Sequence, residues 1–192
     1  FAKRLQQLLE KNIEFNGSNV QQMKSAGPAI LAEVDEALAD YFGDYEVFSS
    51  EEMLYVPIED FNIFFKGFVD AVVKVGDTYH LFDWKTCSWG WDARKKAEKL
   101  VTYQLTLYKH FFCQKHKIDP SKVETHFALL KRTAKKDRVE IFRVTSGPKK
   151  TENALKLLYQ AIYNITKRFT IKNRLSCHKP YPCKLLNTEH CT

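Results

Sequence analysis

The chain has 192 residues, of which 44% are hydrophobic, and its net charge is +7. This length fits one domain with a sizeable core, and no segment approaches the roughly 20 consecutive apolar residues that span a bilayer. The charge is unevenly divided: residues 1–91 carry 7 Lys and Arg against 15 Asp and Glu, whereas residues 92–192 carry 23 against 8. The basic half favours a polyanionic partner such as nucleic acid, although a solubilising surface would explain the same balance.

Hydrophobic periodicity predicts alternating helices and strands. Helices are expected at residues 2–13, 18–42, 92–117 and 148–168. Strands are expected at residues 45–58, 62–75, 78–85, 124–133 and 138–145. Gly27-Pro28 either breaks the second helix or opens its main part. This order predicts a single α/β domain over residues 1–192, with a mixed sheet flanked by helices. Its parts are N-terminal helices (1–44), a core (45–170) and an irregular tail (171–192).

The cysteine count bears on the compartment. The five cysteines are Cys87, Cys113, Cys177, Cys183 and Cys191. An odd count and no visible secretion signal in the first segment, FAKRLQQLLEK, argue against a disulfide framework. A reducing, intracellular compartment is expected: the cytoplasm, the host cytoplasm for a viral protein, or an organelle. Because the first residue is Phe and not Met, the natural protein is expected to extend upstream.

Two acids and a lysine interrupt an otherwise apolar hairpin, GFVDAVVKVGDTYHLFDWKT. Gly76-Asp77 predicts a two-residue type II′ turn, which places Asp70 directly opposite Asp83. Lys85 shares their face, because side chains alternate along a strand. Two carboxylates at that spacing repel by roughly 3 kcal/mol at an effective dielectric constant of 20. The pair therefore indicates a bound cation or a shared proton.

Oxygen ligands on a rigid strand pair suit a hard divalent cation, Mg²⁺ or Mn²⁺. Lys85 could then orient a water molecule or stabilise charge on a phosphate. The alternative is a structural ion pair of Asp70 with Lys85, with Asp83 protonated or solvated. The opposite face of the hairpin is expected to be core: Val69, Ala71, Val73, Phe82 and Trp84.

The helix after the hairpin carries two polar side chains one turn apart. Gln104 and Tyr108 in YQLTLY lie on one helix face, since residues four apart are neighbours. A tyrosine at helical spacing is by itself also typical of a core.

Taken together, these segments resemble the PD-(D/E)xK nuclease superfamily. GFVD, FDWK and QLTLY are similar to the three motifs of its RecB-like branch, which includes phage exonucleases and CRISPR-adaptation nucleases. The resemblance implies a restriction-endonuclease-like core and metal-dependent hydrolysis of phosphodiester bonds.

The resemblance also implies residue roles. Asp70, Asp83 and the backbone carbonyl of Trp84 would bind the metal, and Lys85 would position or activate the attacking water. Gln104 and Tyr108 would line the DNA path and help to fix the site.

The sequence departs from the family pattern at an early helix. Many RecB-like nucleases have Gly-x-x-x-His there, but GPAIL places Leu31 at the histidine position. Glu33 is a candidate substitute metal ligand; the alternative is an ordinary surface acid. Glu52 is interpreted as a solvated strand residue.

The cysteines of the tail are a second departure. Cys177, Cys183 and Cys191 resemble three of the four ligands of an iron–sulfur cluster in this branch, but no fourth precedes the core. His178 and His190 make a zinc site conceivable, and unliganded thiols are the alternative. The other histidines are interpreted as core or surface residues: His80, His110, His116 and His126.

The sequence therefore predicts a Mg²⁺- or Mn²⁺-dependent deoxyribonuclease, most consistent with an exonuclease that acts on single strands or DNA ends. Trp89 and Trp91 could stack on unpaired bases or pack their loop against the core. The rival is a non-catalytic nucleic-acid-binding or assembly module that retains the fold.

Overall fold

The computed structural model describes residues 17–59 and 61–169, with residues 10, 183 and 188 as isolated positions. Its elements are α2 (Gly17–Phe42), β1 (Glu46–Pro57), β2 (Phe64–Val75), β3 (Thr78–Cys87), α3 (Ala93–Lys96), α4 (Lys99–His116), a short 3-10 helix η1 (Pro120–Lys122), β4 (Val123–Lys131), β5 (Val139–Arg143) and α5 (Pro148–Thr166). The helix predicted at residues 2–13 lies outside the described residues. The chain divides into two compact units, residues 1–154 and 155–192, and the five strands, α2 and α4 belong to the first.

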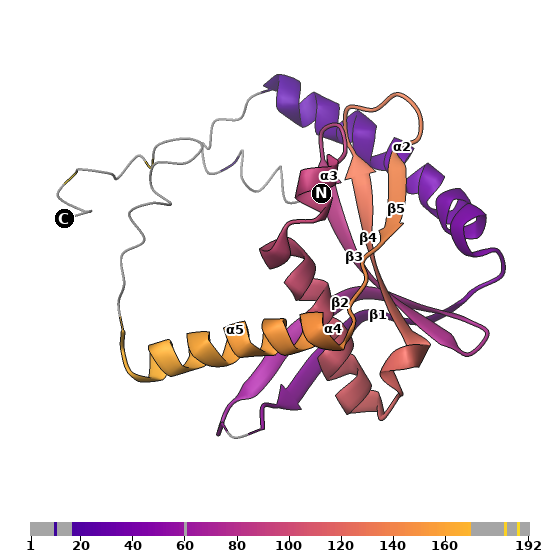
Figure 1. Ribbon diagram of the computed structural model, residues 1–192. Coiled ribbons are helices and arrows are strands. Elements are labelled where there is room, and N and C mark those ends of the chain that lie inside the picture. The colour runs from indigo at the N-terminus through magenta and orange to yellow at the C-terminus, as the bar shows by residue number, and fades with distance from the viewer. Residues whose placement is uncertain (1–9, 11–16, 60, 170–182, 184–187, 189–192) are drawn as a thin grey trace. The chain divides into compact units, whose positions relative to one another are not determined.

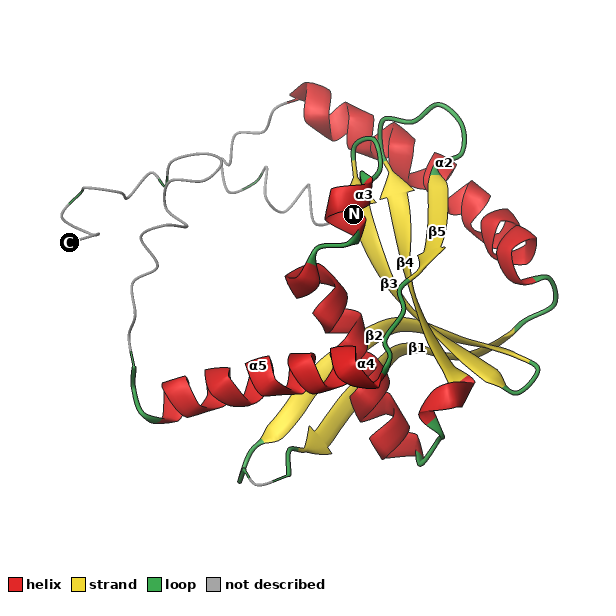
Figure 2. Ribbon diagram, viewed as in Figure 1, coloured by secondary structure: helices red, strands yellow, loops and turns green. Residues whose placement is uncertain are grey.

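The five strands form one mixed sheet in the order β1-β2-β3-β4-β5 (Figure 1). Strands β3 and β4 are parallel, and the other neighbours are antiparallel. A parallel pair needs a long crossover, which α3, α4 and η1 provide. The predicted mixed sheet flanked by helices is confirmed (Figure 2). None of the helices in the described part of the chain is long and apolar enough to cross a membrane.

Each face of the sheet packs on a helix. On one face Leu38 of α2 packs with Phe82 and Ala128, and on the other Leu105 of α4 packs with Phe127. Full burial of a side chain of this size contributes roughly 1.5–3 kcal/mol. The two helices are thereby fixed against opposite faces, and residues of α4 lie over the side of β3 that carries Asp83.

The hairpin follows the predicted register. Val75 pairs with Thr78, and the ladder continues to Ala71 and Phe82. Gly76 has a φ of 55°, as the first position of the predicted turn requires. The ladder ends one pair before the two aspartates.

Two helix predictions need correction. Gly27-Pro28 neither breaks nor opens α2, which runs unbroken from Gly17 to Phe42. Proline removes one backbone donor, and the buried Ile30 and Leu38 hold the helix against the core beyond it. The helix predicted at 92–117 is two helices, because Glu98 has an extended backbone at the start of α4.

Candidate active site

Asp70 and Asp83 lie at the end of the β2–β3 ladder, where the strands separate. The carboxylate of Asp70 accepts a hydrogen bond from the backbone N–H of Trp84, with 2.7 Å between Oδ2 and N. This bond takes the place of a strand–strand bond and ties Asp70 to the residue after Asp83. The two acids predicted from the register are therefore neighbours.

Asp83 is a buried carboxylate held by two side chains. Its Oδ2 lies 2.5 Å from Nζ of Lys85, and its Oδ1 accepts a hydrogen bond of 2.6 Å from the amide of Gln104. The Lys85 contact is an ion pair without hydrogen-bond alignment, so Oδ2 has no hydrogen-bond partner among the described residues. Lys85 thus pairs with Asp83 and not, as in the structural alternative, with Asp70.

The electrostatics of Asp83 follow from its burial. The side chain is only 3% exposed, and desolvation raises its pKa. The close contact with the Lys85 ammonium lowers the pKa, and the nearby charge of Asp70 raises it. A carboxyl with a perturbed pKa and an incompletely bonded oxygen is typical of a functional site.

Gln104 connects the acid to the base. Its Oε1 accepts a hydrogen bond from Lys85 at 3.2 Å, while its Nε2 donates to Asp83 and to the hydroxyl of Tyr108 at 3.1 Å. The primary amide of a glutamine offers a donor and an acceptor at the same time. Helix α4 therefore fixes the orientation of both Asp83 and Lys85.

The close approach of Tyr108 to β2 explains why residue 67, three positions before Asp70, is a glycine. A Cβ at this position would lie 2.9 Å from Cε1 of Tyr108. The missing side chain lets Tyr108 approach β2 and hold Gln104. Asp70, Asp83, Lys85, Gln104 and Tyr108 consequently form one connected group.

The two other acids considered from the sequence are engaged elsewhere. Glu33 accepts a hydrogen bond of 2.7 Å from the backbone N–H of Arg138 and pairs with its guanidinium. Glu52 is not the solvated residue expected: it lies 2.7 Å from both Lys115 and His116, which lower its pKa against the effect of burial.

The structure places both loop tryptophans but only one of the three tail cysteines. Trp91 packs on Phe127, as the loop-packing alternative expects, whereas Trp89 is 78% exposed. Cys183 is exposed, and Cys177 and Cys191 lie outside the described residues.

A basic groove runs beside the first half of α4. The described side chains that line it include five basic residues and no acidic one: Lys96, Lys99, Arg143, Lys149 and Lys150. Thr102 and Tyr103 of α4 form part of its wall. Side-chain cations of this kind suit phosphate contacts.

One cluster of potential metal ligands was not expected from the sequence. His80, Glu124 and His126 come together between β3 and β4 and form the one group of three potential metal ligands found in the described part of the chain. Glu124 and His126 are two residues apart on β4, so their side chains lie on one face of the sheet. His80 lies beside them because it pairs with Glu124 in the parallel β3–β4 register, which the sequence does not reveal.

Comparison with known proteins gives a family match. The family model of the PD-(D/E)XK nuclease superfamily matches residues 2–187. No curated protein matches the chain.

Two solved structures are similar. A candidate exonuclease from Eubacterium rectale aligns with a TM-score of 0.52 at 16% identity, over 78% of this chain and 53% of that chain. SSO0001 aligns with a TM-score of 0.43 at 14% identity, over 71% of this chain and 58% of that chain. This chain thus spans about half the length of the exonuclease, and at that identity the likeness concerns the fold.

Proposed function

Because the chain belongs to the PD-(D/E)XK nuclease superfamily, we propose that it is a metal-dependent deoxyribonuclease, an exonuclease that acts on single strands or DNA ends. The observation that carries the proposal is Asp83: a buried carboxylate beside Asp70, held between Lys85 and Gln104. A buried negative charge destabilises the metal-free protein, and a bound cation would offset that charge.

The residues fit a divalent cation. Members of the superfamily typically use divalent metals, and Asp83 Oδ2 is a buried oxygen without a hydrogen-bond partner among the described residues. Asp70, Asp83 and the carbonyl of Trp84 would hold Mg²⁺ or Mn²⁺. The bound ion would polarise the phosphate and lower the pKa of a water molecule. Glu33 is left out of this set, because Arg138 occupies both its oxygens.

Lys85 has the second role. Its ammonium lies beside Asp83 and is held by Gln104, so it can orient the attacking water and offset negative charge that develops on the phosphate. Tyr108 supports Gln104 from the next turn of α4. The site therefore holds its base and its metal ligands in one hydrogen-bonded unit.

The basic groove supports a nucleic-acid substrate. Its five cations border α4, the helix that supplies Gln104 and Tyr108. The exposed Trp89 is available for stacking on an unpaired base. The groove alone would serve equally well in a non-catalytic binding module, the second candidate function.

End-labelled substrates separate the two functions. Single-stranded and double-stranded oligonucleotides and a closed circular plasmid are incubated with Mg²⁺, Mn²⁺ or a chelator. The exonuclease is expected to shorten single strands or ends only with metal and to spare the closed circle. Binding without cleavage under every condition would favour the non-catalytic module, and cleavage of the closed circle would indicate an endonuclease.

A further inference from the structure

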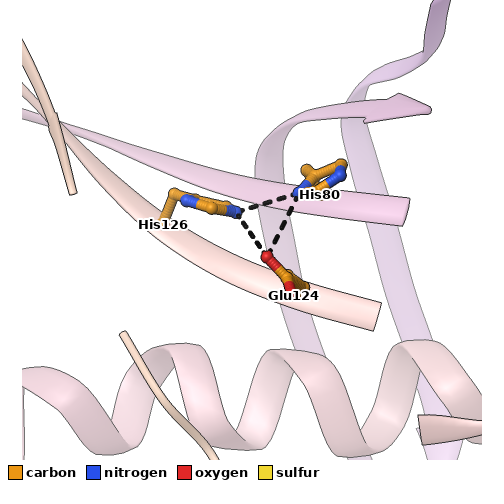
Figure 3. A group of neighbouring side chains, drawn as sticks. All are labelled: His80, Glu124 and His126. Atoms are coloured by element: carbon orange, nitrogen blue, oxygen red, sulfur yellow. Dashed lines mark hydrogen bonds and ion pairs between the residues drawn. The ribbon is translucent and has the colours of Figure 1, made fainter. Parts of the chain in front are cut away.

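His80, Glu124 and His126 form a compact group between the two parallel strands (Figure 3). His80 Nδ1 lies 3.1 Å from His126 Nε2 and 3.7 Å from Glu124 Oε2, and the remaining separation, His126 Nε2 to Glu124 Oε2, is 3.9 Å. Three atoms with these separations share a centre about 2.1 Å from each of them, the length of zinc–nitrogen and zinc–oxygen bonds. The triangle therefore has the dimensions of a coordination face.

The surroundings hold the ligands in place. His126 is 1% exposed, stacks on Phe82 at 5.2 Å between ring centroids, and contacts Phe42, which also contacts His80. Arg143 pairs with Oε1 of Glu124 at 2.9 Å, which leaves Oε2 directed at the two rings. Both imidazoles and the carboxylate are thus oriented before any ion binds.

The two imidazoles face each other through ring nitrogens. The 3.1 Å contact between His80 Nδ1 and His126 Nε2 is a hydrogen bond, in which one of the two nitrogens carries the proton. A neutral imidazole can carry its proton on either nitrogen, so a change of tautomer frees both facing lone pairs for a cation. Glu124 is the most exposed of the three side chains.

We propose that His80, Glu124 and His126 bind one Zn²⁺ ion, at a site separate from the Asp70–Asp83 pair. Two imidazole nitrogens and one carboxylate oxygen are a ligand set that zinc accepts, with a fourth position for water, whereas Mg²⁺ prefers oxygen ligands throughout. The ion joins β3 to β4 at the register pair His80–Glu124. It would stabilise the strand that carries Asp83 and Lys85.

The test measures zinc binding by the full chain, without a nuclease readout, so its outcome is independent of the proposed activity. All proteins carry Asp83→Asn, Cys177→Ser, Cys183→Ser and Cys191→Ser, together with His178→Gln and His190→Gln, which removes the candidate zinc ligands of the tail and one carboxylate of the Asp70–Asp83 pair. After dialysis against a chelator, Zn²⁺ is titrated in competition with a chromophoric chelator, and elemental analysis gives the stoichiometry. We expect one ion per chain and a rise in Tm on zinc addition.

Three variants locate the site. His80→Gln and Glu124→Gln should lower zinc affinity by at least about 100-fold and 10-fold respectively and remove the rise in Tm. His116→Gln is the matched control, since it removes an imidazole that also contacts a carboxylate, Glu52. It should leave zinc affinity unchanged.

Circular dichroism checks that each metal-free variant is folded. If His80→Gln unfolds, Glu124→Gln still tests the site, because Glu124 is the most exposed of the three side chains. Substoichiometric zinc, or equal affinity in Glu124→Gln, would overturn the proposal. In the chain with its cysteines intact, Co²⁺ at this site should show no thiolate charge-transfer band; a strong band would assign the metal to the tail instead.

Discussion

Asp83 combines burial with charge, and its neighbours show how the protein tolerates this. Lys85 offsets the charge and Gln104 satisfies one oxygen, yet burial still raises the pKa. The sequence predicted the Asp70–Asp83 neighbourhood from the hairpin register, because a two-residue turn fixes every facing pair. It did not predict that Gln104 bridges acid and lysine, since the packing of α4 on the sheet depends on contacts between distant segments.

Asp83→Asn should lower cleavage by roughly 1,000-fold and leave the protein folded. Asparagine keeps an oxygen for Gln104 but removes the negative charge that would hold the proposed metal ion. In the native chain the folded-state pKa of Asp83 lies above its ordinary value of 3.8, so the stability that this group contributes is present at lower pH and is lost as pH rises through the raised pKa.

Without metal, the free energy of unfolding of Asp83→Asn relative to the native chain should therefore increase with pH. Thermal unfolding at several pH values, with and without Mn²⁺, checks this. Mn²⁺ should stabilise the variant less than the native chain. Native-level cleavage by the variant would rule out Asp83 as a metal ligand.

Lys85→Met should reduce turnover by roughly 100-fold or more while DNA affinity changes little. Methionine keeps a side chain of similar length but removes the ammonium, which lies beside Asp83 and over the Phe127 ring. Affinity is measured in Ca²⁺ and turnover in Mg²⁺. The opposite result, weak binding with normal turnover, would make Lys85 a binding residue.

At the scale of elements, hydrophobic periodicity predicted where the helices and strands lie. It did not predict where a helix continues or is interrupted. The strands and the antiparallel hairpin are close to the predicted ranges. Pro28 misled because local propensity was outweighed by packing of Ile30 and Leu38. The parallel β3–β4 register has no local signal, and for that reason the His80–Glu124–His126 cluster was not foreseen.

The approach of α4 to β2 gives a prediction at this scale. Gly67→Ala should destabilise the protein by about 1–3 kcal/mol, because the new methyl group would lie too close to Tyr108. Displacement of Tyr108 should also lower turnover through Gln104. Denaturant unfolding gives the free energy.

Gly27→Ala is the control for that substitution. Apart from its chain neighbours, nothing lies within 4 Å of a Cβ at Gly27, which is inside α2. Alanine should change stability by less than about 0.5 kcal/mol, because its better helix propensity is offset by the restriction that Pro28 places on the residue before it. Combining Gly67→Ala with Tyr108→Ala should cost less than the sum of the two single changes. Strict additivity would show that Tyr108 is not the group displaced.

For the whole molecule, the acidic and basic halves of the sequence supply different charged features of the structure. The acidic half of the sequence contributes the Asp70–Asp83 pair, and the basic half contributes the groove lined by Lys96, Lys99 and Lys149. The total of +7 could not locate the groove, because many cations pair with acids: Lys96, for example, contacts Glu140. Folding selects which charges face a ligand.

The salt dependence of DNA binding tests the groove. Lys149→Gln and Lys122→Gln each remove one exposed lysine that pairs with an acid, Glu152 in the first case and Asp77 in the second. The two lysines are therefore matched in charge and setting, and they differ in that Lys149 lines the groove and Lys122 does not.

Each phosphate contact releases counterions, and Lys149→Gln should therefore weaken binding and reduce the slope of log affinity against log salt by about 1. Lys122→Gln should leave the slope unchanged. Fluorescence anisotropy with a labelled single strand in Ca²⁺, at several salt concentrations, measures both. Equal slopes for the two variants would mean that the DNA does not follow this groove.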